Sequence, residues 1–301
     1  MSMHFAQMAR SFAAGGLLSG EELLRLRREA WADGRITHEE AEALFALNAQ
    51  LRDASPQWVD FFAEAVAAFV LDRCETEGTI DSATAAWLIG QIDADGEIRS
   101  LAEIEALIRV FDRAAAVPQA FKDYAISQME MAVREGVGPT REPGRLTATE
   151  ARLLRSSIFA PVSEGFDTIG RKEAETLFRI KDAALGADNA PEFRGLFVQG
   201  IADFVSAYAR ENAQLDRDRR IALRSFMADC SGGIGGFLCR LARIMPDAFE
   251  RLFDPGGSED GTPSETKRPM APEHQWLDAR IGADQRIDVY EQALLDFLVE
   301  R

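Results

Sequence analysis

The sequence predicts an all-α protein, and two observations carry that prediction. Apolar residues recur at spacings of three and four along most of the chain, whereas the two-residue alternation typical of strands is nearly absent. The clearest example is a wide apolar stripe that indicates a buried helix, formed by Trp58, Phe61, Phe62, Ala65, Val66, Phe69 and Val70.

The starts of the helices are marked by capping boxes. In this pattern a Ser, Thr or Asp side chain accepts a hydrogen bond from the first helical turn, and a Glu three residues later reaches back to the cap N–H. In chain order the pattern occurs at Ser19/Glu22, Thr37/Glu40, Ser100/Glu103, Thr147/Glu150 and Asp288/Glu291. Pro56, Pro118 and Pro191 predict three further starts, because proline fits the first turn of a helix.

Composition limits the compartment and the partners. The 301 residues carry a net charge of −16, so we expect no nucleic-acid partner. No apolar run is long enough to span a membrane, and no secretion signal is recognised. The three cysteines form no CxxC pair, which favours a reduced, cytoplasmic location.

One short phrase is repeated along the chain: the end of an apolar helix, an acidic turn, an Ile, and a capped helix that carries a Glu. The clearest copies span residues 32–36, 94–98 and 283–287, and two divergent copies lie around Ile80 and Ile169. We expect the Ile to plug the core at each turn. A repeated unit of this kind buries its apolar face only against a neighbouring unit.

The repeats predict two tandem domains, residues 1–140 and 141–301, each a pseudo-twofold pair of EF-hand-like helical hairpins. Residues 56–70 align with residues 191–205 at an offset of 135, and residues 40–45 align with residues 173–178. The Gly- and Pro-rich stretch 136–144 would link the halves. The second half would be divergent, with an inserted disordered loop near residues 254–275.

The acidic turns are the candidate metal sites. Asp93, Asp95, Glu97 and Glu103 place alternating carboxylates around a Gly turn, as in a calcium loop, and Asp33 and Glu40 form a weaker version. With Gly96 at the sixth position of an EF-hand loop, however, Gln91 and Ala102 occupy the first and twelfth positions, where oxygen ligands are required. Three readings stay open: a capped helix junction, a variant Ca²⁺ or Mg²⁺ site, and a standard EF-hand.

Other motifs offer little chemistry. The Gly-rich stretch 231–236 has no following Lys-Ser or Lys-Thr, so it does not fit a phosphate-binding loop. The three histidines cannot build a zinc site, and His38 is expected at the surface. Cys74 is expected to be structural, with a reactive thiol as the alternative. No Ser–His–Asp or Cys–His arrangement is apparent, so we expect no catalytic residues and no enzyme activity.

The phrase Ala-Asp-Gly-x-Ile, followed by a Glu and a Leu-rich helix, resembles the TerB-like tellurite-resistance family, best at residues 32–45 and 94–107. The resemblance implies an all-α fold, divalent-metal binding in acidic loops, and a role in stress and tellurite resistance. It also implies protein partners in assemblies peripheral to the cytoplasmic face of the membrane. The tandem arrangement departs from the family pattern, and Gly170 and Gln285 weaken the acidic loops of the second half.

The first functional hypothesis is therefore a non-enzymatic interaction scaffold whose acidic loops respond to divalent cations. The alternatives are an EF-hand-like calcium sensor, and a small-molecule-binding or catalytic helical protein with an inter-domain pocket.

Overall fold

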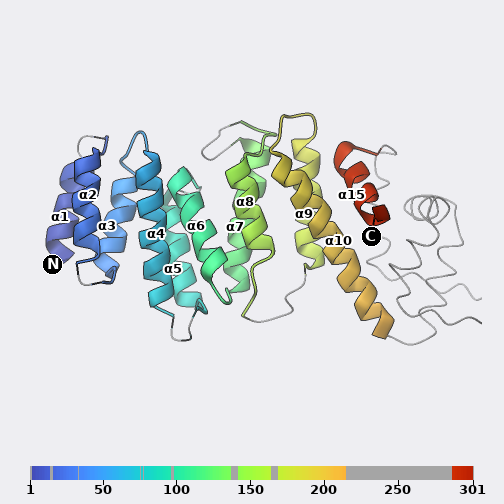
Figure 1. The fold of residues 1–301 in the computed structure, drawn as a ribbon, viewed down its shortest axis with the longest axis horizontal. Coiled ribbons are helices and arrows are strands. Elements are labelled where there is room, and N and C mark those ends of the chain that lie inside the picture. Colours follow the sequence, from blue (N-terminus) through green and yellow to red (C-terminus); the bar gives the residue numbers. More distant parts are fainter. Residues whose placement is uncertain are drawn as a thin grey trace, which may run out of the picture. The chain divides into compact units, whose positions relative to one another are not determined.

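The computed structural model describes residues 2–13, 16–32, 34–74, 76, 78–95, 98–136, 142–163, 169–214 and 287–300. Within these ranges the chain is helical and forms no strand, which confirms the all-α prediction (Figure 1). The elements are α1 (Ser2–Ala13), α2 (Gly20–Ala30), α3 (His38–Asn48), α4 (Pro56–Asp72), α5 (Ser82–Ile92), the 3₁₀ turn η1 (Asp93–Asp95), α6 (Leu101–Arg113), α7 (Gln119–Glu135), α8 (Ala148–Ile158), α9 (Arg171–Ala184), α10 (Pro191–Gln214) and α15 (Val289–Glu300).

The helices belong to two compact units. The first comprises residues 1–167 and 182–193, and the second comprises residues 168–181 and 194–301. The first unit extends in sequence beyond the predicted linker at 136–144, because α8 packs on α6 and α7. The tandem duplication itself stays a prediction. The predicted inserted loop at 254–275 lies outside the described residues.

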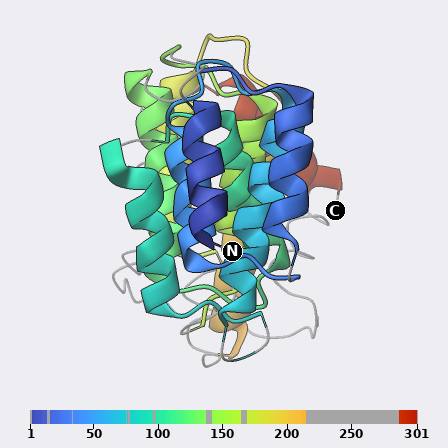
Figure 2. The same cartoon turned by 90° about the vertical axis from the view of Figure 1, so that its left-hand side faces the viewer.

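The first unit is built from two layers of helices. Successive packing contacts join α2, α4, α6 and α8 in one layer, and α1, α3, α5 and α7 in the other. Further contacts of α1 with α2, α3 with α4, and α7 with α8 join the layers. Figure 2 shows α1 and α2 side by side at the N-terminal end of this stack. Each helix thus buries its apolar face against its neighbours, as the repeated unit predicted.

Helix α4 forms the centre of the first unit, and the predicted apolar stripe is its buried surface. Trp58, Phe61 and Phe62 are at most 1% exposed, and every other residue of the stripe is also buried. The phenyl ring of Phe45 on α3 meets that of Phe62 edge-on, with centroids 5.1 Å apart. Aromatic rings in this geometry add about 1 kcal/mol beyond the burial of their area.

The isoleucines of the repeated phrase are core residues in four of the five copies. Ile36, Ile80, Ile98 and Ile169 are each buried, at 7% exposure or less. Ile287 differs, because 48% of its surface is exposed. The Ile of the repeated phrase is therefore buried in the core in every copy except the one that precedes α15.

Candidate functional site

Four capping boxes form in full, at Ser19, Thr37, Ser100 and Thr147, with both reciprocal hydrogen bonds present. The fifth forms at Asp288, whose Oδ1 accepts from the backbone N–H of Glu291 while Glu291 Oε2 accepts from that of Asp288. Each acid thereby satisfies backbone donors that the helix itself leaves unpaired.

Glu103, a predicted metal ligand, is engaged on both carboxylate oxygens. Its Oε2 accepts from the backbone N–H groups of Arg99 at 3.0 Å and Ser100 at 3.1 Å, and its Oε1 accepts from Asn48 Nδ2 at 3.0 Å. The residue is only 9% exposed. A carboxylate surrounded in this way is committed to the fold, and a cation would have to displace these donors.

Glu40, the weaker candidate ligand, lies in the same kind of environment. It is 4% exposed, and its Oε2 accepts from the backbone N–H of Thr37 at 2.9 Å. The two described capping acids of the candidate set therefore support the helix-junction reading of the acidic turns.

The remaining candidate ligands are differently placed. Asp93 is exposed on η1, with the Tyr124 hydroxyl 3.5 Å from its Oδ1. Asp33, Glu97 and the side chain of Asp95 lie outside the described residues. Among the described side chains, no group of three or more His, Cys, Asp or Glu is arranged to hold a metal ion. The cation site at residues 93–103 stays a prediction.

Asn48, at the end of α3, forms a buried polar joint with α6 and α4. Its Nδ2 donates to Ser100 Oγ at 2.9 Å and to Glu103 Oε1, while its Oδ1 accepts from Trp58 Nε1 at 3.0 Å. Asn48 is 5% exposed and Trp58 is fully buried. Every polar group of this joint has a partner, which is the condition under which a buried polar network stabilises a fold.

The second unit contains a joint at the aligned positions. Lys181 aligns with Asn48 through the 40–45/173–178 match, and its Nζ donates to Asp288 Oδ2 at 2.5 Å and to Glu291 Oε1 at 3.0 Å. In the sequence alone, Phe193, the last residue of the first unit, stands at the position that aligns with Trp58. The two differences are chemically consistent with each other. Lys181 has no acceptor where Asn48 has one, and Phe193 has no donor where Trp58 has one.

An aromatic contact is also repeated. Phe178 and Phe197 align with Phe45 and Phe62, and their rings meet edge-on with centroids 5.3 Å apart. A duplicated chain would retain such matched pairs of contacts. The contacts of Asn48 with α6 and of Lys181 with α15 were missed in the sequence because these partners lie more than fifty residues apart.

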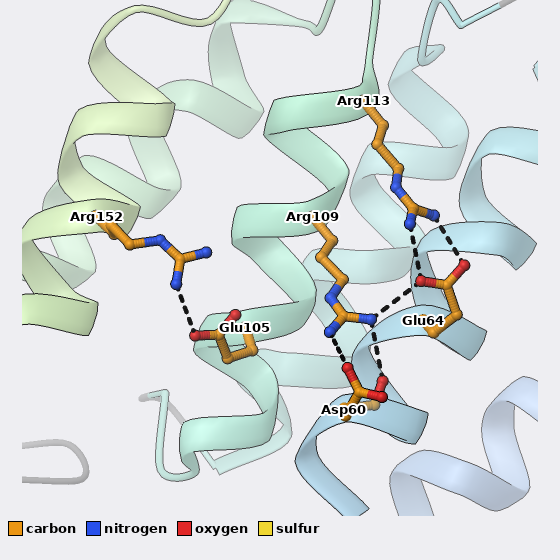
Figure 3. Close-up of polar contacts among 6 residues, drawn as sticks. All are labelled: Asp60, Glu64, Glu105, Arg109, Arg113 and Arg152. Atoms are coloured by element: carbon orange, nitrogen blue, oxygen red, sulfur yellow. Dashed lines mark hydrogen bonds and ion pairs between the residues drawn. The ribbon is translucent and has the colours of Figure 1, made fainter. Parts of the chain in front are cut away.

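Charged side chains of α4, α6 and α8 pair with one another across one face of the first unit (Figure 3). Arg109 on α6 pairs with Asp60, and its Nη1 lies 3.0 Å from Glu64 Oε2. Arg113 binds both oxygens of Glu64, at 2.8 and 3.0 Å. Donation from Arg113 holds the pKa of Glu64 below its usual value, despite the opposing effect of burial. These contacts tie α6 to α4.

The same face continues onto α8. Arg152 Nη1 lies 3.2 Å from Glu105 Oε1, and Ser156 Oγ donates to Asp112 Oδ1 at 2.7 Å. We call the set Asp60, Glu64, Glu105, Arg109, Asp112, Arg113, Arg152 and Ser156 the charged ladder. Its contacts connect α6 to α4 and to α8.

Two single residues can be placed. His38 is exposed, as expected, and its Nε2 lies 3.2 Å from Glu42 Oε1. Burial raises the pKa of the Cys74 thiol, and nearby Asp81 raises it further. A raised pKa leaves less of the reactive thiolate, so the environment of Cys74 agrees with a structural role.

Comparisons of the chain with protein-family models, curated proteins and solved structures gave no match. The TerB-like resemblance therefore stays a prediction. Among the described helices, none is long and apolar enough to cross a membrane.

Proposed function

We propose that this protein is a non-enzymatic helical scaffold of the TerB-like, stress-response type, which holds protein partners rather than transforming a substrate. The observation that carries the proposal is the commitment of the repeated acidic motif to architecture. Glu103 uses one carboxylate oxygen for the helix cap and the other for Asn48, and the capping acids Asp288 and Glu291 bind Lys181. Capping acids that stabilise the contacts between helices support a scaffold function rather than a metal-binding one.

The charged ladder is the surface that this proposal assigns to partners. It spans three helices, carries both signs of charge, and is held in place by its own ion pairs. Because its side chains are already ordered, a partner would lose little conformational entropy of the scaffold on docking. Alternating charges contribute specificity and association rate more than affinity.

The test is affinity capture from the native cells, with the intact chain as bait and with or without a chelator. The Arg109→Glu variant reverses the centre of the ladder, and Arg10→Glu is the matched control at an exposed site on α1. We expect a reproducible set of captured proteins that Arg109→Glu loses and Arg10→Glu retains. An identical set for both variants would contradict the role of the ladder, and an empty set under every condition would contradict the scaffold.

A calcium sensor is the alternative, favoured by the exposure of Asp93 at the acidic turn. Calorimetric titration with Ca²⁺ and Mg²⁺ separates the two functions. Tight, stoichiometric calcium binding that Asp95→Ala abolishes would favour the sensor. If millimolar cation produces no heat of binding, the sensor function is excluded and the scaffold function remains. Glu22→Gln, in the capping box of α2, is the control for a nonspecific loss of negative charge.

A further inference from the structure

The joint that holds α15 in the second unit carries an unbalanced charge. Lys181, Glu291 and Asp288 have side chains that are 4%, 5% and 13% exposed, respectively. Among the described residues, one ammonium group therefore faces two carboxylates at a nearly buried site, and these three side chains together carry an excess of one negative charge. Such an excess is unfavourable in a low-dielectric interior, and one bound proton removes it.

The hydrogen bonds indicate which carboxylate takes the proton. Asp288 caps α15: its Oδ1 accepts from the backbone N–H groups of Tyr290 at 2.8 Å and Glu291 at 3.0 Å. Asp288 thus accepts two backbone N–H groups on Oδ1 and the Lys181 ammonium on Oδ2. Glu291 has weaker support, from Lys181 Nζ at 3.0 Å and the backbone N–H of Asp288 at 3.2 Å.

Among the described residues, the charged groups that face Glu291 come from α9 and from the start of its own helix. Lys181 reaches it from α9, and Asp288 lies at the start of its own helix. Helix α10 contributes the ring of Phe197, which packs against Tyr290 with centroids 6.1 Å apart. Burial raises the pKa of Glu291, and the charge of Asp288 raises it further, while donation from Lys181 and Asp288 opposes the rise.

We propose that α15 is docked by a proton-linked latch: protonation of Glu291 makes the Lys181–Asp288–Glu291 triad neutral and tightens the docking of the C-terminal helix. This property is independent of the scaffold function.

The direction of the pH dependence of docking follows from the raised pKa of Glu291. Because the pKa of Glu291 is higher with α15 docked than with α15 released, the docked state binds the proton more tightly. Docking therefore strengthens as the pH falls through the raised value toward the ordinary carboxyl range. The latch is therefore tighter in mild acid than at pH 7.

Hydrogen exchange of the full-length chain tests this. The protection of the α15 amides, corrected for intrinsic exchange and compared with α4, measures the local opening of α15. Between pH 7 and mild acid we expect protection to rise, by at most about tenfold per pH unit, which is the limit for one linked proton. Glu291→Gln mimics the protonated acid and retains a capping-box residue. It should raise protection at pH 7 and flatten the pH response.

Glu22→Gln is the matched control, because Glu22 belongs to a capping box whose hydrogen bonds lower its pKa. It should leave the response of α15 unchanged. Protection of α15 that falls from pH 7 into mild acid would overturn the latch, as would an unchanged pH response in Glu291→Gln. Carboxyl NMR of the unmodified chain gives a check that needs no variant: a titration midpoint for Glu291 at or below the ordinary value would refute the proposal.

Discussion

Removing the Asn48 side chain should destabilise the first unit by several kcal/mol. Asn48→Ala deletes the hydrogen bond to the buried Glu103 carboxylate and leaves the indole N–H of Trp58 without its acceptor. A hydrogen bond to a charged group contributes about 1.5–3 kcal/mol, and an unsatisfied buried donor costs about 1–3 kcal/mol. The sum predicts a loss of about 2.5–6 kcal/mol.

A double-mutant cycle isolates the Asn48–Trp58 pair. Trp58→Phe deletes the donor that Asn48→Ala leaves unpaired, so the two losses should add to more than the loss in the double variant, by about 1–3 kcal/mol. Trp87→Phe is the matched control, because the indole N–H of Trp87 has no partner among the described residues. It should show no coupling with Asn48→Ala.

Tryptophan fluorescence during urea denaturation is a suitable assay. Trp31, Trp58 and Trp87, three of the four tryptophans, lie in the first unit, and circular dichroism would follow the whole chain. In the Trp58→Phe variants, the fluorescence of the first unit comes from its two remaining tryptophans, Trp31 and Trp87. A loss below about 1 kcal/mol for Asn48→Ala, or a coupling energy near zero, would refute the account of the joint.

Two further predictions concern the surface and a turn. Because the pKa of Glu64 is lowered in the fold, its ion pair with Arg113 should stabilise the first unit above the ordinary carboxyl pKa and lose this effect as the pH falls through the lowered value. Glu64→Gln should cost no more than about 1 kcal/mol, and added salt should shrink the loss, as denaturation at two ionic strengths would show. Gly136→Ala should cost more than about 1 kcal/mol, since Gly136 has a φ of +69° and a Cβ there would lie 2.6 Å from Pro143 Cδ. Gly90→Ala on α5, where a Cβ meets nothing within 4 Å, should be neutral or stabilising by thermal denaturation; a similar loss in both would contradict the argument.

The helices could be predicted because their signals are local. The caps at Ser19, Thr37, Ser100 and Thr147 are fixed by residues three positions apart, and all four form with both hydrogen bonds. Pro118 shows the limit of such signals: it stands at the cap position, one residue before α7, rather than in the first turn.

The candidate site was less predictable, because its contacts depend on tertiary packing. In the sequence Asn48 is a polar residue near the end of a helix, and nothing local distinguishes it from a surface residue. Its partner Glu103 is 55 positions away. The charged ladder has the same origin, since Arg109 and Glu64 are 45 positions apart and meet only after α6 packs on α4. The capping roles of Glu40 and Glu103 could be predicted from the sequence, whereas their burial and the contact of Glu103 with Asn48 required the fold.

The charged ladder also limits how α4 and α6 can slide past each other. Asp60 and Glu64 are four residues apart, as are Arg109 and Arg113, so each pair repeats at close to one helical turn, about 5.4 Å. A displacement of one full turn re-forms part of the ladder, whereas a displacement of half a turn matches none of it. The ladder therefore favours one register of α4 against α6, in agreement with the register that the apolar side of α4 sets.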